Sequence, residues 1–287
     1  MSEPIVPAIK KYDEALVIES SEQYELSIQL SPDGFLFCLF HPELNKYLSY
    51  ESIKLNGVNS ETDFADKFEQ TVHSNEWLSR SFNSVRVLYE NTTSTIIPSS
   101  LYSQADKDLY ARFNFSLPEN NACHSDFINS IDAYLIYHMS KSLTKRIEHL
   151  FPKHKLNSTS AHLIEALLIN YKNVGSEKRM FVNVKNAFLD IAIIEDKQVL
   201  FFNTFAYQST EDFIYYIIFV IEQLNINPEN IDLTFSGIID KKSKLFETAY
   251  TYIRNIKFQK LPGIHNYSYI FNDVPAHYYF NLLSRGL

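Results

Sequence analysis

The stretch LSIQLSPDGFLFCLF, from Leu26 to Phe40, predicts two β-strands joined by a tight turn. Leu26, Ile28 and Leu30 alternate with polar residues, which is the pattern of a half-buried strand. The sequence Ser-Pro-Asp-Gly at 31–34 then predicts a hairpin turn, because its glycine is free to adopt positive φ. The apolar run 35–40 predicts the second strand, so this part of the chain is expected to form a β-hairpin.

The elements that follow the hairpin predict a compact α/β unit. A third strand is expected at 46–55, and the pattern Ser60-x-x-Asp63 predicts the capped start of a helix. A strand is expected at 84–89, and Ser103-x-x-Asp106 predicts the start of another helix. The middle of the chain is less regular and predicts strands at 133–138 and 155–158 and helices at 142–151 and 161–171.

The opening pattern then recurs. Three strands are expected at 180–184, 188–194 and 198–206. A helix at 211–224 follows, with Ser209-x-x-Asp212 as its cap and apolar residues almost all round, so we expect it to be deeply buried. A strand at 233–236, a helix at 241–252 and a strand at 255–258 complete the second set.

One unit of strand, strand, strand, helix, strand and helix therefore starts near Ile28 and again near Val182. This predicts an α/β protein made by duplication, with two mixed-sheet halves, helices on their faces and a cleft between the halves. The expected boundaries are an N-terminal extension at 1–23, a first half at 24–175 and a second half at 176–287.

The duplicated unit resembles the actin-like ATPase (ribonuclease H-like) fold of actin, sugar kinases and heat-shock chaperones. The stretches that carry a closer resemblance are LSIQLSPDGFLFCLF, IIPSSLY at 96–102 and NTFAYQSTEDFIYYIIFVIEQLNINPENIDLTFSGIID at 203–240. Together they are similar to a bacterial family of unknown function with this fold, over about residues 24 to 260. The resemblance implies the fold and brings no established activity.

The resemblance also implies where phosphates would bind, because active relatives place an Asp and glycines in the turn of each leading hairpin. Here the first turn has one Asp, one Gly and Pro32, which has no N–H to donate. The second turn, Lys-Asn-Ala-Phe at 185–188, has no acid and no glycine. Only 6 glycines occur in the chain, and their spacing excludes G-x-G-x-x-G, the Walker loop and G-x-S-x-G. ATP and Mg²⁺ are possible but not expected cofactors.

Seven residues are candidates for a ligand-binding cleft. Asp33 and Gly34, with Ser31, are the best remnant of a phosphate loop, and the alternative is a plain hairpin turn. Lys185 and Asn186 are candidates for contact with an anionic ligand, and the alternative is another polar turn. Ser236 and Gly237 end a strand where open α/β sheets bind ligands, and the alternative is simple strand termination.

No residue is predicted to be catalytic or to bind a metal. His149, His154 and His162 lack a zinc-binding motif. Asp132 and Asp190 are expected to face solvent or to lie in turns rather than to act as acids. The aromatic residues at 201, 202, 205, 207, 213, 215 and 216 predict mainly core, with one apolar face as a possible partner surface.

Composition limits the class of partner. With 34 acidic against 26 basic residues the net charge is −8, which disfavours nucleic acid. The longest apolar run, 213–221, is far shorter than the ~20 residues of a membrane helix, and no secretory signal is visible. The expectation is a cytoplasmic protein of unknown function, a pseudo-ATPase that binds an unknown protein partner. The alternatives are a nucleotide-binding ATPase or phosphotransferase with unusual loops, or a self-assembling protein.

Overall fold

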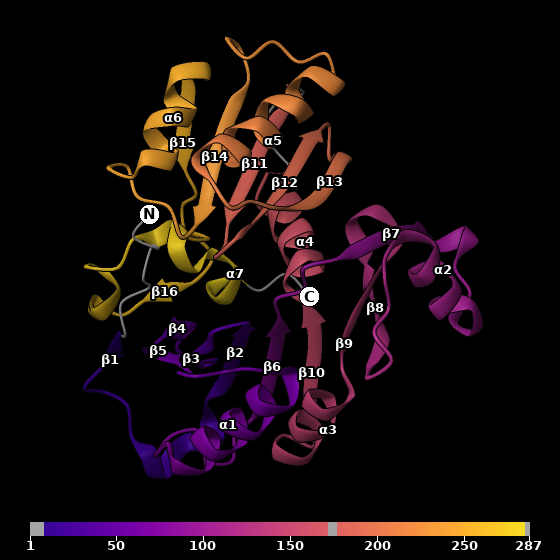
Figure 1. The fold of residues 1–287 in the computed structure, drawn as a ribbon. Helices are drawn as coiled ribbons and strands as arrows, with labels where there is room; N and C mark the ends of the chain where they lie inside the picture. Colours follow the sequence, from indigo (N-terminus) through magenta and orange to yellow (C-terminus); the bar gives the residue numbers. More distant parts are fainter. Residues whose placement is uncertain (1–8, 172–176, 285–287) are drawn as a thin grey trace. The chain divides into compact units, whose positions relative to one another are not determined.

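The computed structural model describes residues 9–171 and 177–284, and the protein is a mixed α/β chain (Figure 1). Its contacts divide it into two compact units. The first unit holds Pro7–His162 and Pro262–Val274, and the second holds Leu163–Leu261 and the chain from Pro275 on. The expected domain boundaries stay predictions, and the one at 175/176 lies outside the described residues.

The first unit is built on a sheet with the strand order β1-β5-β3-β2-β6-β10. The hairpin β2–β3 is antiparallel, whereas β2 pairs in parallel with β6, and β6 pairs in parallel with β10. The short strand β4 pairs with β3 and, in parallel, with β16 near the end of the chain. The strands are β1 (Lys10–Tyr12), β2 (Glu25–Ser31), β3 (Gly34–His41), β4 (Lys46–Tyr47), β5 (Ser49–Lys54), β6 (Ser84–Tyr89), β10 (His154–Ser158) and β16 (Asn266–Tyr267).

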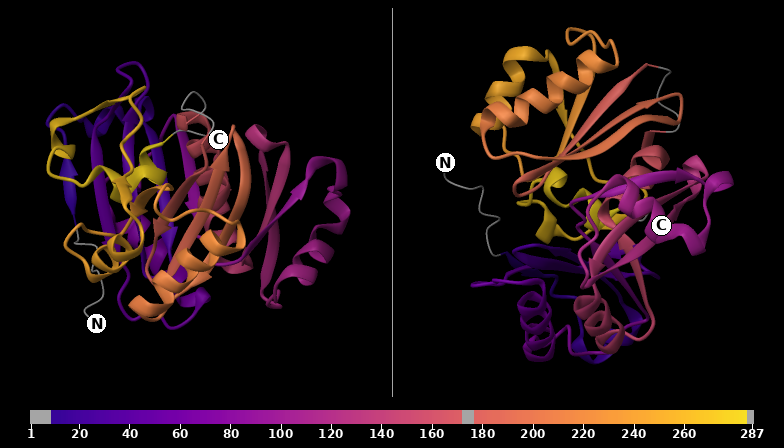
Figure 2. Two further views of the ribbon diagram at one scale, coloured as in Figure 1. Left: turned by 90° about the horizontal axis from the view of Figure 1, so that it is seen from above. Right: turned by 45° about the vertical axis from the view of Figure 1, so that its right-hand side comes forward.

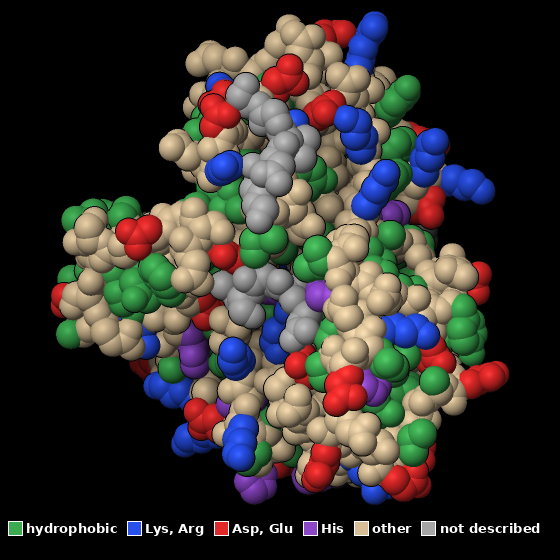
Figure 3. Space-filling model, turned by 180° about the vertical axis from the view of Figure 1, so that it is seen from behind, with side chains coloured by type: hydrophobic (Ala, Val, Ile, Leu, Met, Phe, Trp, Pro, Cys, Tyr) green, Lys and Arg blue, Asp and Glu red, His purple; other side chains and the backbone are tan. Residues whose placement is uncertain are grey.

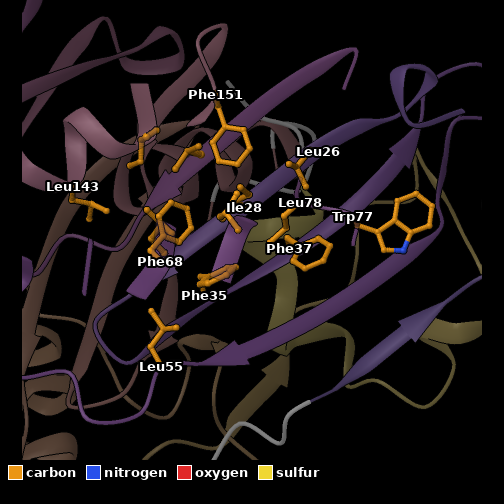
Figure 4. Close-up of a cluster of buried hydrophobic side chains, with 14 of the residues drawn as sticks. Leu26, Ile28, Phe35, Phe37, Leu55, Phe68, Trp77, Leu78, Leu143 and Phe151 are labelled. Carbon is orange, nitrogen blue, oxygen red and sulfur yellow. The ribbon is translucent and has the colours of Figure 1, made fainter. Parts of the chain in front are cut away.

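Helices α1 (Glu61–Ser74) and α3 (Lys141–Leu150) lie side by side on one face of this sheet (Figures 1 and 2). The predicted cap of α1 is confirmed, since the Ser60 side chain accepts a hydrogen bond from the Asp63 N–H. Between the helices and the sheet lies a large apolar core, and Figure 4 shows Phe35 of β3, Phe68 of α1 and Leu143 of α3 within it. Burial of these side chains holds both helices on the sheet.

The first unit also contains a separate, smaller sheet. Its strands lie between β6 and β10 in the sequence. Its order is β7-β9-β8, all antiparallel, and α2 (Lys107–Asn114) packs against it. The strands are β7 (Ser94–Pro98), β8 (Asn121–Ile128) and β9 (Ala133–Ser140). The sequence pattern does not predict β8, because the apolar residues of NACHSDFI stand in two adjacent pairs separated by His124, Ser125 and Asp126 and show no period-two alternation.

The second unit has a sheet of five strands in the order β13-β12-β11-β14-β15. The hairpin β11–β12 is antiparallel, β11 pairs in parallel with β14, and β14 with β15. The order and directions are those of β5-β3-β2-β6-β10 in the first unit. The strands are β11 (Arg179–Val184), β12 (Phe188–Glu195), β13 (Gln198–Ala206), β14 (Asp232–Gly237) and β15 (Asn255–Phe258).

Helices α5 (Thr210–Gln223) and α6 (Lys244–Tyr252) cover one face of this second sheet. The predicted capping box of Ser209 and Asp212 is confirmed. The expectation that α5 is deeply buried is wrong, since Tyr215 is 60% exposed and Phe219 is 37% exposed. The helix packs on the sheet through one side only, so its outer aromatic residues remain at the surface.

Helix α4 (Thr159–Tyr171) follows β10 and runs from the first unit into the second. The described part of the chain also contains the short helix α7 (Phe280–Leu283) and six 3₁₀ turns: η1 (Ile18–Gln23), η2 (Ser99–Leu101), η3 (Gln104–Asp106), η4 (Asn129–Ile131), η5 (Tyr269–Phe271) and η6 (Ala276–Tyr279). Among the described residues, every helix is too short or too polar to cross a membrane.

The substitution Gly34→Ala tests the backbone packing that places the first hairpin. A Cβ at Gly34 would lie 2.2 Å from the Ile53 carbonyl oxygen on β5, so one of the two strands must shift. We expect a loss of about 1–3 kcal/mol in the free energy of unfolding. Trp77, the only tryptophan, is buried in the first unit and reports its urea unfolding by fluorescence.

The matched control is Gly263→Ala in the same unit, where a Cβ would meet nothing within 4 Å. It should change stability by no more than about 0.5 kcal/mol. Equal effects of the two substitutions would contradict the packing argument.

Candidate functional site

The first hairpin turn contains Ser31, Asp33 and Gly34. Ser31 pairs with Gly34 across the hairpin, so Pro32 and Asp33 form the exposed tip. Gly34 is not among the described residues with positive φ, which corrects the reason expected for this glycine. The glycine is needed instead because β5 passes so close that its Ile53 carbonyl occupies the space of a side chain. The turn is therefore explained by strand packing, and Asp33 lies at its tip, exposed to solvent.

A cavity of about 300 Å³ lies beside this turn, inside the first unit. It opens at the carboxyl ends of the parallel strands β2 and β6, and the N-termini of α1 and α3 reach it. Open α/β sheets bind ligands at this edge. The lining residues are Leu30, Ser31, Pro32, Val58, Asn59, Ser60, Glu61, Phe64, Tyr89, Glu90, Thr92, His138, Ser140 and Leu143. Of the predicted candidates Ser31 lines the cavity, whereas Asp33 and Gly34 do not.

Two carboxylates give the cavity its charge. Glu90 directly follows β6 and is only 7% exposed, and the Ser31 hydroxyl donates a hydrogen bond to its Oε2 at 3.1 Å. Glu61 is the first residue of α1, and its Oε1 accepts from the Asn121 amide at 3.4 Å. Among the described residues that line the cavity there is neither lysine nor arginine.

His138 on β9 completes the polar wall. Its Nδ1 lies 2.8 Å from the Asn121 amide nitrogen, and its Nε2 lies 3.1 Å from the Thr93 hydroxyl. Because the Asn121 amide nitrogen can only donate, Nδ1 accepts from it and the ring proton lies on Nε2. Burial lowers the pKa of His138, and the nearby Glu61 carboxylate only partly opposes this effect. The imidazole is therefore neutral near pH 7 and adds no positive charge to the cavity.

The second hairpin turn contains Lys185 and Asn186, in the second unit. Lys185 is buried, with its side chain 4% exposed, and its Nζ lies 2.9 Å from Asp190 Oδ2. The Tyr207 hydroxyl donates to the Lys185 carbonyl oxygen at 2.9 Å, which holds the turn against the loop that precedes α5. Asn186 is half-buried next to Ala187, which has φ of +60°. The lysine predicted to contact an anion is thus neutralised within its own unit.

The Lys185–Asp190 pair belongs to a row of polar side chains that crosses four strands. Asp190 accepts hydrogen bonds from the Asn183 amide at 3.0 Å and from the Thr204 hydroxyl at 2.7 Å. Ser236 donates to Asn183 Oδ1 at 3.1 Å. The register explains the row, since Asn183 lies opposite both Asp190 and Ser236 and Asp190 lies opposite Thr204.

Gly237 ends β14 beside this row and has φ of +78°. A Cβ there would lie 2.0 Å from the Val184 carbonyl oxygen, and the next residue's N–H donates to that same oxygen at 2.7 Å. The close approach of β11 therefore requires glycine. The structure brings Lys185, Ser236 and Gly237 together in the second unit, whereas Ser31, Asp33 and Gly34 belong to the first. A cleft shared by the two sets stays a prediction.

Several of these polar groups are not predicted by the sequence. Asp190 is buried at 1% exposure, which corrects the expectation of a solvent or turn position. The sequence does hold a signal for it, because Asp190 is the only polar residue in the apolar stretch 188–194. Glu61, Glu90 and His138 have no comparable signal, since their proximity depends on strand order. Asp132 lies in an exposed turn with φ of +49°, as expected.

The histidines considered for zinc do not gather into a site. His154 Nδ1 contacts the Phe151 carbonyl oxygen, and His149 is exposed. Within residues 9–171 and 177–284 no group of three His, Cys, Asp or Glu side chains is placed to hold a metal ion.

The buried ion pair predicts a strong effect of single substitutions. Lys185→Met leaves the Asp190 carboxylate buried without its cation. Asp190→Leu leaves the Lys185 ammonium buried without its anion. Each should cost about 3–5 kcal/mol in the free energy of unfolding, measured by urea denaturation with circular dichroism. The double variant should cost much less than the sum of the two losses, because both buried charges are gone. Additive losses would show that the two side chains act independently.

Comparison with known proteins places these features in a family. The model of the family "Protein of unknown function (DUF3822)" matches residues 13–256. A crystal structure from Bacteroides thetaiotaomicron, described as a protein with actin-like ATPase fold and unknown function, is 26% identical. It superposes with a TM-score of 0.77 over 85% of this chain and 93% of that one.

A PilM–PilN type IV pilus biogenesis complex is similar in fold alone, at 7% identity and a TM-score of 0.57, over 90% of this chain and 96% of that chain. No curated protein matches the chain. The protein has the actin-like ATPase fold, and the chain belongs to the DUF3822 family of proteins of unknown function.

Proposed function

We propose that the protein is a non-catalytic binding module of the cytoplasm, a pseudo-ATPase that has kept the actin-like fold and lost phosphate binding. The observation that carries the proposal is electrostatic. Lys185, the cation of the second turn, forms a buried ion pair with Asp190. The cavity beside the first turn presents Glu61 and Glu90 and, among its described lining residues, no lysine or arginine.

A nucleotide triphosphate would be repelled at this cavity. Two carboxylates about 4 Å from a phosphate each cost roughly 1 kcal/mol even with the screening of bulk water, and several times more in a partly buried site. The turn itself offers fewer backbone donors, because Pro32 lacks an N–H. These features support loss of the phosphate-binding role that the resemblance assigns to the leading hairpins.

Binding to a macromolecule fits the remaining features. The shared strand order of the two sheets supports a duplicated unit. The PilM–PilN structure, which is similar in fold, is a complex of type IV pilus biogenesis, so a role in protein assembly is compatible with this fold. Acidic and basic side chains are interspersed on the face in Figure 3, which favours a protein over a nucleic acid as partner.

The proposal predicts no stabilisation by nucleotide. At about 10 mM, a ligand with a Kd of about 0.1 mM would stabilise the native state by about 2.7 kcal/mol, which raises the unfolding temperature by several degrees. We expect no such shift with ATP or ADP, with or without Mg²⁺, and no phosphate release above a protein-free control. A clear nucleotide-dependent shift would refute the pseudo-ATPase and favour the alternative of a nucleotide-binding enzyme.

Self-association is a second candidate, favoured by an aromatic surface on the second unit. Strand β13 is an edge strand without a charged residue, and Leu200 on it is 40% exposed. On α5 the exposed rings of Tyr215 and Phe219 stack with centroids 6.0 Å apart. Long uncharged edge strands are prone to pair with another chain.

If this surface joins copies of the protein, light scattering will show a mass that rises with concentration. Tyr215→Glu should then return the mass to that of a monomer, whereas Tyr250→Glu on α6, similarly exposed at 62%, should not. A constant monomer mass for the unchanged protein would exclude self-association.

A further inference from the structure

We infer that the outer strand of the second unit, β13, receives an extended strand from a partner protein, and that this strand has an uncharged, apolar middle and basic residues at both ends. The inference rests on the proposed function, that of a binding module, and goes further by naming the face that binds and the chemistry of the partner. The open edge of β13 and the aromatic and acidic side chains of the neighbouring α5 carry it (Figure 1).

β13 differs from the other strands that end the two main sheets. It has 9 residues and no charge, and among the described residues it pairs with β12 alone. The other three end strands have only 3 to 5 residues, and each carries lysine: Lys10 and Lys11 in β1, Lys155 in β10 and Lys257 in β15. Lysine on an edge strand discourages pairing with a further strand. β13 lacks this protection over its whole length.

The backbone of β13 offers hydrogen-bonding groups on its open side. Its register with β12 is regular over 201–206, and just beyond it the Tyr207 N–H donates to the Ala187 carbonyl oxygen at 3.0 Å. Because the direction of these groups alternates along an antiparallel strand, the even-numbered residues of this stretch point their N–H and C=O groups away from β12. The Thr204 N–H confirms this direction, since it donates to the Asn203 side chain at 2.9 Å. An extended chain presents donors and acceptors that match this spacing.

A row of aromatic rings leads from this edge onto the outer side of α5. Phe205 of β13 stacks on Tyr216 with ring centroids 4.6 Å apart. Tyr216 contacts Tyr215 edge-to-face at 5.4 Å, and Tyr215 stacks on Phe219 at 6.0 Å. Side chains on the α5 side of an added strand therefore meet aromatic rings. This favours apolar residues at alternate positions of the partner strand.

Acidic residues flank the aromatic pair on the exposed side of α5. Residues spaced by three or four positions share one side of a helix, and here they are all exposed: Glu211, Tyr215, Phe219 and Glu222. The stretch 195–222, from the turn before β13 to α5, has five acidic residues and one basic residue, so its net charge is −4. Basic residues at the ends of a partner strand complement this charge, whereas a second copy of this chain would bring a second charge of −4 to the same interface.

The test uses the full chain and a synthetic peptide of alternating valine and threonine with two lysines at each end, followed by fluorescence anisotropy. Two matched peptides change one property each: glutamate replaces every lysine in one, and the valine and threonine amide nitrogens are methylated in the other. We expect the lysine peptide to bind at least about ten-fold more tightly than the glutamate peptide, and more weakly as salt rises. Methylation should weaken binding about ten-fold or more, because it removes the backbone donors.

Variants of the protein locate the binding. Ala206→Pro removes a donor on the open side of β13 and places a ring in the path of an added strand, so binding should fall about ten-fold or more. Glu211→Lys should weaken the lysine peptide about three-fold or more and strengthen the glutamate peptide. Glu247→Lys, on α6 of the same unit and equally exposed, makes the same change in net charge and should alter neither affinity by more than about two-fold. Glu211→Lys leaves the capping box of Ser209 and Asp212 in place, so it is expected to fold and keeps the test decisive if Ala206→Pro does not.

The inference is overturned if the lysine peptide does not bind, if either matched peptide binds equally well, or if Glu211→Lys and Glu247→Lys behave alike. A dimer that forms without peptide and that Ala206→Pro dissociates would assign the edge to a second copy of this chain, which also overturns the inference. Nucleotide-induced stabilisation would instead overturn the proposed function. Because the nucleotide measurement does not involve the peptide, the two failures remain distinguishable.

Discussion

Each unit depends on one pairing: the first strand of its leading hairpin pairs in parallel with the strand that follows the next helix. In the first unit this is β2 with β6, and in the second it is β11 with β14. Parallel pairing needs a crossover connection, so α1 and α5 must lie on a face of the sheet. The pairing also brings the hairpin turn and the end of the second parallel strand to one edge. The cavity and the polar row both lie at that edge.

The two units use this edge differently. In the second unit, strand register aligns one polar residue from each of four strands, and Lys185 neutralises the buried Asp190. The result is a filled site with its charge balanced internally. In the first unit the edge stays hollow, and Glu61 and Glu90 line it, with no lysine or arginine among its described lining residues. The same edge of the shared strand order thus holds a closed polar cluster in the second unit and an open cavity in the first.

This difference supports the proposal that the protein has lost phosphate binding. A phosphate-binding edge needs donors and positive charge, and the described lining of the cavity supplies acceptors and negative charge. The family has no established activity, so the chemistry of the edge is the informative feature. It supports the proposal of a binding protein.

The sequence by itself determined most of the secondary structure of both units, its order and the capped helix starts at Ser60 and Ser209. Period-two and helical apolar patterns, turn residues and caps are local signals, and they agree with the structure because the apolar faces they define are the faces that pack. The absence of the usual glycine loops is likewise a property of the sequence alone.

Tertiary structure alone decided why Gly34 is a glycine, how far α5 is exposed and which polar residues meet. Gly34 depends on the passage of β5, and Glu61, Glu90 and His138 come together from three separate segments. Strand order and register set such encounters, and neither is encoded in the local pattern around any one of these residues.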